Sequence, residues 1–205
     1  MPTMEFSGFS DGIQLVDAVL GLLIASIAGY AFINRKIIRN KDRNLLVLVS
    51  TGGTCRDPMA KAILMHLLKE DSSKLEIVSA GTASQGDRPA TPMAIRVANR
   101  RLGKDYLFGH KSSFLDQSLI DSAKLILTMG VDNKSTLTKN FVNADQKTFT
   151  IREFLGEAGT IVDPYSSSDV SSPDAEKRYE KTFDDLFGLL SKNGNALTIF
   201  RSVVR

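Results

Sequence analysis

The stretch VSTGGTCRDPMAKAI, residues 49–63, determines how the rest of the chain is interpreted. It continues an apolar run, residues 44–50, whose length and Leu/Val content are typical of a strand buried on both faces. A glycine-containing loop follows and ends at Arg56. Apolar residues then recur at helical spacing over residues 58–70, with Pro58 in the first turn, where a helix tolerates proline. A strand, a glycine loop and a helix N-terminus in this order predict a phosphate cradle.

Strand and helix patterns alternate through the rest of the chain. Residues 75–82, 122–129 and 147–154 have the composition of further strands. The predicted later helices cover residues 91–102, ended by Gly103, and residues 172–194, with Ser172 as the cap. Such alternation predicts an α/β domain over residues 44–205, with three α/β/α layers and a four-stranded parallel sheet. Ligands bind beyond the carboxyl ends of the strands in sheets of this kind.

The order of several motifs resembles the low-molecular-weight protein tyrosine phosphatase family. Its members carry a Cys-x5-Arg-Ser/Thr-Pro loop between the first strand and helix, and a general-acid Asp in a late Asp-Pro pair. Here Ser50-x5-Arg56-Asp57-Pro58 has the same spacing, and Asp163 precedes a proline just ahead of the final helix. The SAGT and LILTM segments also fall in order, so the resemblance extends over about residues 44–192.

This resemblance implies a role for each position of the site. Ser50 takes the position of the nucleophile, Arg56 that of the phosphate clamp and Asp163 that of the general acid. Thr54 is similar to the loop threonine of the bacterial protein arginine phosphatase branch. No metal or cofactor is implied. The loop that would wrap the phosphate contains Ser50, Thr51, Gly52, Gly53, Thr54, Cys55 and Arg56.

Three residues of the loop depart from the family pattern. Ser50 replaces the cysteine, and no base lies near it in sequence, because His66 and His110 fall elsewhere. Asp57 replaces a hydroxyl residue. Its charge would repel a phosphate about 5 Å away by about 3 kcal/mol at an effective dielectric constant of about 20, unless Asp57 pairs with the neighbouring Arg56. Gly53 replaces the usual Asn, so the changes indicate divergence rather than one engineered substitution.

These departures leave two functions open. The first is a phosphatase-like protein with impaired catalysis, a pseudophosphatase that binds a phosphorylated side chain, a phosphate-like anion or a protein. The alternative is an active phosphatase for phosphotyrosine or phosphoarginine, either through an unusual nucleophile or because Ser50 was engineered. Cys55 is expected to be a small buried residue rather than a second nucleophile. The related arsenate reductases need several thiols, and the chain contains one cysteine.

The N-terminus is predicted to be a separate, membrane-spanning piece. Residues 13–33 form an apolar run with one charge, Asp17, and basic residues 34–43 follow it. A signal peptide would carry its positive charge before the apolar run, and a buried helix of the domain is the remaining alternative. The positive-inside rule places residues 1–12 outside and the phosphatase-like domain in the cytoplasm, behind a basic juxtamembrane linker.

Composition adds little beyond these motifs. The net charge of +3 and the pI of about 9.0 arise partly from the basic linker, so we expect no nucleic-acid partner. The single cysteine excludes an intramolecular disulfide, which fits a reducing compartment. The oligomeric state is left open by the sequence.

Overall fold

The computed structural model describes Ser26, residues 43–165 and residues 173–204. The predicted N-terminus, membrane helix and most of the basic linker (1–12, 13–33 and 34–43) therefore lie outside the described residues, except Ser26 and Arg43. Among the residues that are described, no helix is both long and apolar enough to cross a bilayer. A compact unit begins at Arg43.

A parallel sheet forms the centre of this unit, as predicted. Its strands are β1 (Leu45–Ser50), β2 (Glu76–Gly81), β3 (Leu125–Thr128) and β4 (Thr148–Thr150). Their order across the sheet is β2-β1-β3-β4, and every neighbouring pair is parallel. The chain winds away from β1 in both directions, so the carboxyl ends of β1 and β3 border the crevice where such sheets bind ligands.

Helices cover the two faces of this sheet. Their bounds are α2 (Arg56–Leu68), α3 (Pro92–Leu102), α4 (Gln117–Ser122), α5 (Val131–Asn140), α6 (Ile151–Phe154), α7 (Pro173–Ser191) and α8 (Asn195–Val204). Short 3-10 turns connect some of them: η1 (Lys69–Lys74), η2 (Asp145–Lys147) and η3 (Lys192–Gly194).

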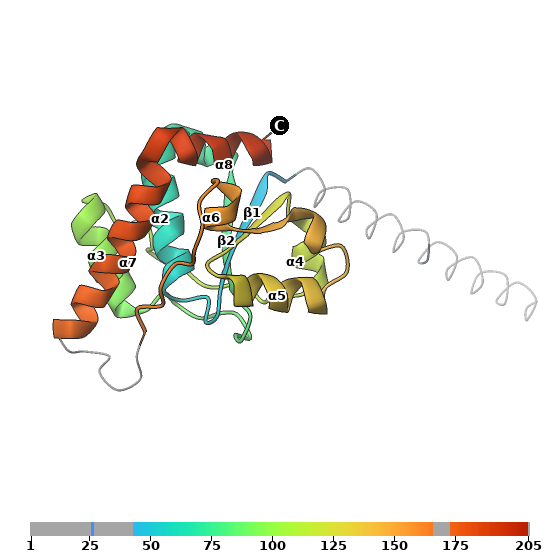
Figure 1. Ribbon diagram of the computed structural model, residues 1–205, viewed down its shortest axis with the longest axis horizontal. Helices are drawn as coiled ribbons and strands as arrows, with labels where there is room; N and C mark the ends of the chain where they lie inside the picture. The colour runs from blue at the N-terminus through green and yellow to red at the C-terminus, as the bar shows by residue number, and fades with distance from the viewer. Residues whose placement is uncertain (1–25, 27–42, 166–172, 205) are drawn as a thin grey trace, which may run out of the picture. The chain divides into compact units, whose positions relative to one another are not determined.

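Alternate side chains of β1 enter two different cores. Leu46 and Leu48 pack into the core formed with α2, α3, α7 and α8. Leu45, Val47 and Val49 pack into the core on the other face, with residues of α4 and α5. Figure 1 shows these two groups of helices on opposite sides of β1 and β2. The predicted three-layer α/β/α arrangement with a four-stranded parallel sheet is therefore confirmed.

Local signals explain where the sequence predictions of single elements succeeded and failed. The helix predicted over 91–102 is confirmed as α3, and Gly103 ends it in a left-handed conformation. The strand predicted over 147–154 is wrong in its second half. Thr150 and Glu153 form a capping box there, which ends β4 and begins α6. The third strand begins at Leu125 rather than 122, because α4 extends to Ser122.

The C-terminal region also differs from its prediction. The helix predicted over 172–194 appears as α7, but Asn193 has a positive φ of 49°, and α8 continues the chain after this kink. The predicted cap, Ser172, lies outside the described residues. Helix α8 buries Ile199 and Val203 in the core on the α2 side of the sheet, so it belongs to this domain.

Candidate functional site

The loop from Ser50 to Arg56 connects the central strand to α2. Its backbone is held by the segment that follows β2, since the N–H groups of Thr82 and Ala83 donate to the carbonyls of Ser50 (3.0 Å) and Thr51 (2.9 Å). The loop side chains around these anchors include buried Ser50 and Thr54. This geometry places the quoted loop at the carboxyl end of β1, where the sequence predicted it.

Gly53 adopts a conformation that few other residues would accept. Its φ is +69°, and a Cβ added there would lie 2.9 Å from the backbone nitrogen of Gly81. Two chain segments therefore touch backbone to backbone at this point. The departure from the family's Asn thus has a local reason: this loop packs too closely against the end of β2 to admit a side chain.

The side chain at position 50 is bonded to the side chain at position 57. Ser50 Oγ donates to Asp57 Oδ1 at 2.6 Å, and the Gly53 N–H donates to Ser50 Oγ at 3.1 Å. The expectation that no base lies near Ser50 is therefore wrong. A potential base does lie beside Ser50, because α2 folds back over the end of β1. Among the described contacts, Asp57 pairs with Ser50 rather than with Arg56.

Asp57 is fully buried, which changes its protonation. Burial raises the pKa of this carboxyl to about 7, even though the hydrogen bond from Ser50 and the charge of Arg56 both lower it. Its Oδ2 atom has no hydrogen-bond partner among the described residues, and neither has the hydroxyl of nearby Ser79. The carboxyl is therefore poised to gain or lose a proton close to neutral pH.

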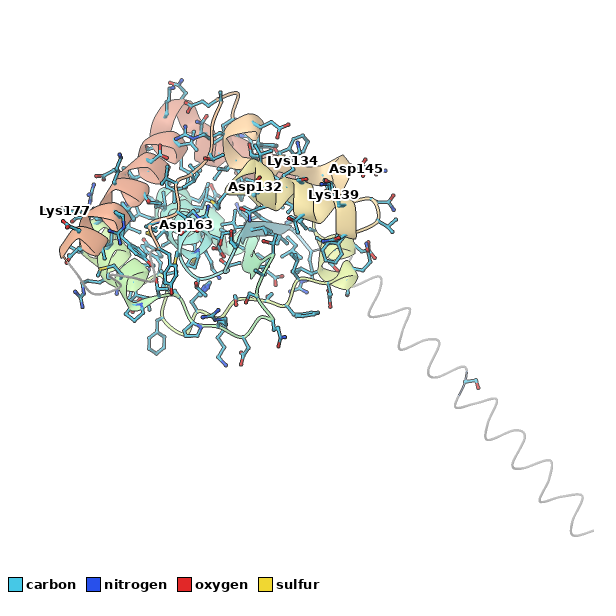
Figure 2. All side chains as sticks on the ribbon, turned by 60° about the horizontal axis from the view of Figure 1, so that its bottom comes forward. Asp132, Lys134, Lys139, Asp145, Asp163 and Lys177 are labelled. Atoms are coloured by element: carbon cyan, nitrogen blue, oxygen red, sulfur yellow. The ribbon has the colours of Figure 1, made fainter. Side chains whose placement is uncertain are left out.

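Arg56 and Asp163 meet across the mouth of the loop. The Arg56 guanidinium binds Asp163 Oδ2 at 2.5 Å through Nη2 and the carbonyl of Ile161 at 3.2 Å through Nη1. Its Nε is buried and has no hydrogen-bond partner among the described residues. In the view of Figure 2, Asp163 lies between α7, marked by Lys177, and α5, marked by Asp132. The structure thus brings together the three positions predicted to be catalytic.

These residues line a pocket of about 280 Å³. Its lining residues are Ser50, Thr51, Gly52, Thr54, Cys55, Arg56, Arg88, Thr91, Asp163 and Tyr165. Exposed Arg88 brings a second positive charge, which the sequence prediction missed because it lies in a loop far from the motif. Asn133 was also missed. It is buried on α5 and donates to the hydroxyls of Thr51 (3.2 Å) and Thr82 (3.3 Å). These hydrogen bonds link α5 to the phosphate-binding loop and to the residue that follows β2.

Cys55 lines this pocket, whereas the two histidines lie elsewhere. The Cys55 sulfur is buried, 3.2 Å from the hydroxyl of Tyr179 on α7. His66 lies 3.3 Å from the hydroxyl of Tyr106. Burial, helped by the charge of Lys61, lowers the pKa of His110 to about 4. Neither histidine lines the pocket, as the sequence analysis expected.

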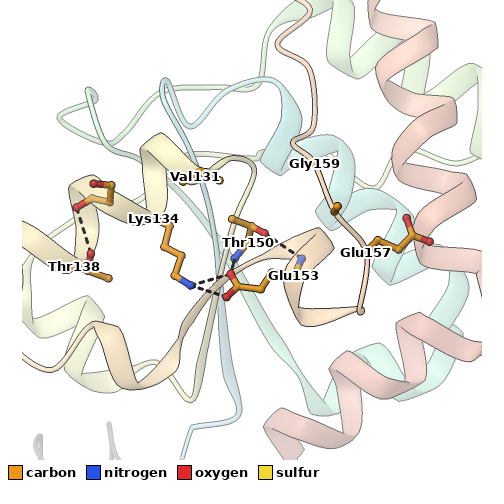
Figure 3. A pocket seen from close by; sticks show the side chains of 9 residues that line it. Val131, Lys134, Thr138, Thr150, Glu153, Glu157 and Gly159 are labelled. Atoms are coloured by element: carbon orange, nitrogen blue, oxygen red, sulfur yellow. Dashed lines mark hydrogen bonds and ion pairs between the residues drawn. The ribbon is translucent and has the colours of Figure 1, made fainter.

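A larger hollow of about 480 Å³ lies between α5 and α6 (Figure 3). Its charged side chains already bind one another or their neighbours. Lys134 lies 2.8 Å from Glu153, and Glu157 binds Arg152 and Lys192. The charges in its lining are therefore already paired, whereas the smaller pocket contains two arginines, Arg56 and Arg88, and one acidic residue, Asp163. The smaller pocket is the better candidate for chemistry.

Comparisons with known proteins agree with this choice. The sequence profile of the family "Low molecular weight phosphotyrosine protein phosphatase" matches residues 45–196. A protein-arginine-phosphatase of Bacillus subtilis is 31% identical over 147 residues, which cover 71% of this chain and 91% of that protein.

Similar solved structures also come from low molecular weight phosphatases. A low molecular weight protein tyrosine phosphatase from T. tengcongensis has 32% identity and a TM-score of 0.63, covering 72% of this chain and 95% of its own. A cysteine-to-serine mutant of the arginine phosphatase YwlE, with a phosphorylated active-site serine, has 29% identity and a TM-score of 0.61, covering 74% and 99%.

The buried carboxyl predicts how stability depends on pH. The pKa of Asp57 rises from 3.8 to about 7 on folding, so the unfolded chain loses this proton at lower pH than the folded chain does. Stability should then fall by roughly 4 kcal/mol as the pH rises from about 4 to about 7, and level off above that. Asp57→Asn removes this contribution, so urea unfolding of both proteins across this range should show the difference. If the unfolding free energies of the wild type and Asp57→Asn changed with pH in parallel, the raised pKa of Asp57 would be contradicted.

Proposed function

Because the chain belongs to the low molecular weight phosphotyrosine protein phosphatase family, we propose that it is a working protein phosphatase with serine as its nucleophile. The observation that carries the proposal is the convergence of Ser50, Arg56 and Asp163 on one pocket. Relatives that align over most of this domain are named as protein arginine and protein tyrosine phosphatases. A phosphorylated protein side chain is thus the class of substrate.

Each group of the pocket has a task in this reaction. The N-terminus of α2 and the loop N–H groups bind the phosphate oxygens, and the Arg56 guanidinium adds charge-assisted hydrogen bonds. When the phosphate arrives, Asp163 leaves its ion pair with Arg56 and takes up a proton from water. Asp163 then protonates the leaving oxygen or nitrogen of the substrate, and later takes a proton from the attacking water.

Ser50 receives the phosphoryl group in this proposal. The phosphorylated serine in the mutant relative supports it, because there a serine at the active site carries a phosphoryl group. In the first step the Ser50 oxygen bonds to phosphorus while the bond from phosphorus to the substrate breaks. In the second step water displaces Ser50, and inorganic phosphate leaves. Because an alkoxide is a poorer leaving group than a thiolate, the second step should be slow.

Phosphoarginine is the substrate we favour over phosphotyrosine. Thr54 lines the pocket, and its hydroxyl is able to accept a hydrogen bond from a guanidinium N–H. The phenol ring of phosphotyrosine offers no donor there. The match to protein arginine phosphatases supports the same preference.

A binding protein with impaired catalysis is the remaining candidate. It follows from the negative charge of Asp57 next to the cradle and from the weak nucleophilicity of a serine hydroxyl. The relatives support the active enzyme better, and the bond from Ser50 to Asp57 removes the argument that no base is present. A phosphatase assay separates the two functions.

We further propose that residues 13–33 anchor the chain in a membrane, with the phosphatase domain in the cytoplasm. Support comes from the apolar sequence of this segment and from the basic residues that follow it. In such an arrangement the substrates would be phosphoproteins at or near the membrane surface.

The full-length protein should hydrolyse p-nitrophenyl phosphate and release phosphate from phosphoarginine protein. Arg56→Lys keeps the charge but loses the planar fork, so we expect kcat/KM to fall by about 100-fold or more. Ser50→Ala should abolish turnover, and intact-mass measurement should find a phosphoryl group on the wild type only. Wild-type turnover no higher than that of Ser50→Ala would favour the binding protein.

Substrate choice should depend on the hydroxyl of Thr54. Thr54→Val keeps the shape of the side chain and removes the acceptor. We expect kcat/KM for a phosphoarginine peptide to fall about 10-fold or more, since one hydrogen bond to a charged group contributes about 1.5–3 kcal/mol. The phosphotyrosine peptide of the same sequence is the control and should change little. An equal loss for both peptides would argue against a role in selectivity.

The anchor is tested by extraction of membranes. Alkaline carbonate should leave the full-length chain in the membrane pellet, because a spanning helix is held by its apolar surface rather than by charge. A chain lacking residues 1–33 is the control and should appear in the supernatant. Release of the full-length chain would rule out a spanning helix.

A further inference from the structure

We propose that Asp57 is the general base of this site: it takes the proton of Ser50 as the Ser50 oxygen attacks phosphorus. The inference rests on the proposed function and adds a catalytic residue to it. The resemblance gives this position only a hydroxyl, so no base is inherited here.

The geometry supplies the first argument. The 2.6 Å bond from Ser50 Oγ to Asp57 Oδ1 fixes the direction of the serine proton, and it points away from the pocket. The Gly53 N–H donates to the same oxygen at 3.1 Å, which stabilises negative charge as it develops. The serine proton is directed at Asp57, and one lone pair of Oγ accepts from Gly53. The other lone pair of Oγ remains to attack phosphorus in the pocket.

The chemistry of the nucleophile supplies the second argument. A cysteine reaches its thiolate form easily, since a free thiol has a pKa of about 8.5. A serine hydroxyl stays protonated at neutral pH and attacks only if a base accepts its proton in the transition state. Exchanging cysteine for serine therefore creates a need that a carboxylate at position 57 meets and a hydroxyl does not.

The surroundings of Asp57 supply the third argument. The groups that act on it are Ser50 on β1, Ser79 on β2 and Arg56 on its own helix, and only Arg56 is charged. Burial raises its pKa to about 7, so the carboxyl is a stronger base than an exposed aspartate and is still ionised in part at neutral pH. Ser50 makes the one side-chain hydrogen bond to this carboxyl that is found among the described residues, and Oδ2 has no such partner there.

Both steps balance with Asp57 in this role. In the first, the bond from Ser50 Oγ to phosphorus forms, the bond to the substrate breaks, the serine proton moves to Asp57, and Asp163 gives its proton to the leaving group. In the second, the water oxygen forms a bond to phosphorus and Asp163 takes the proton of this water. The bond from phosphorus to Oγ then breaks, and Asp57 returns its proton to Oγ. No further reactant is needed.

The test substitutes residues 50 and 57, singly and together, in the full-length protein. Phosphoryl transfer from p-nitrophenyl phosphate is followed by burst kinetics, because p-nitrophenolate needs no acid to leave. Asp57→Asn keeps the bond from Ser50, and its new N–H₂ group has the free hydroxyl of Ser79 nearby. We expect the transfer rate to fall about 10²–10⁴-fold. The rise of the wild-type rate with pH through about 7 should disappear.

A second measurement separates a base from a merely structural residue. Inorganic phosphate, used as a competitive inhibitor, should bind Asp57→Asn as well as or better than wild type, since a negative charge has been removed. A structural defect would weaken phosphate binding and transfer together. That result, or a rate and pH profile unchanged from wild type, would overturn the role of Asp57.

The Ser50→Cys variant serves as the control protein in which the substitutions at Asp57 are repeated. There Asp57 is a hindrance, because a carboxylate beside a thiol disfavours the thiolate. The double variant Ser50→Cys/Asp57→Ser should therefore transfer phosphate faster than Ser50→Cys alone, whereas Asp57→Ser alone should be slower than wild type. If Asp57→Ser changed the transfer rate in the same direction in the wild type and in Ser50→Cys, the inference would be overturned. A wild type without turnover would instead overturn the proposed function and with it this role.

Discussion

The buried hydrogen bond between Ser50 and Asp57 joins the end of the central strand to the first turn of α2. It lies where the two faces of the sheet, the phosphate loop and the helix N-terminus meet, and both partners are almost completely buried. A carboxyl in such a place costs free energy unless it is protonated or bonded. The site meets this constraint with one short bond and a raised pKa, and the same two features give the carboxyl its capacity for proton transfer.

A second interaction connects this buried pair to solvent. Arg56 is buried along its length but reaches half-exposed Asp163, which belongs to a segment far away in the sequence. The guanidinium also holds the carbonyl of Ile161, so the Asp-Pro segment is tied to α2. An arriving phosphate would compete with one carboxylate for one cation. The resting ion pair thus keeps both groups close to their places without a ligand.

Most of the fold could be predicted from the sequence, because its signals are local. The buried run of β1 and the capped α3 are set by residues close to one another in the chain. The capping box of Thr150 and Glu153 was equally local, but the apolar residues around it have the composition of a strand, so its outcome was missed. Ser50, Arg56 and Asp163 were found through motif spacing. Arg88 and Asn133 were not, because their roles arise only when distant loops and helices converge on the pocket.

The role of Asp57 was misjudged for a related physical reason. Considered alone, its charge adds to that of the phosphate and weakens binding. In the family the resemblance describes, however, the loop already carries one negative charge, on the cysteine thiolate, which a neighbouring hydroxyl stabilises. Here the hydroxyl is at position 50 and the carboxyl at position 57, so the pair again holds one hydroxyl and, when Asp57 is ionised, one negative charge, with the positions exchanged. Serine at position 50 and aspartate at position 57 each appear damaging when considered alone. Together they leave the phosphate-binding loop with the same charge as in the family, so the two changes compensate for each other.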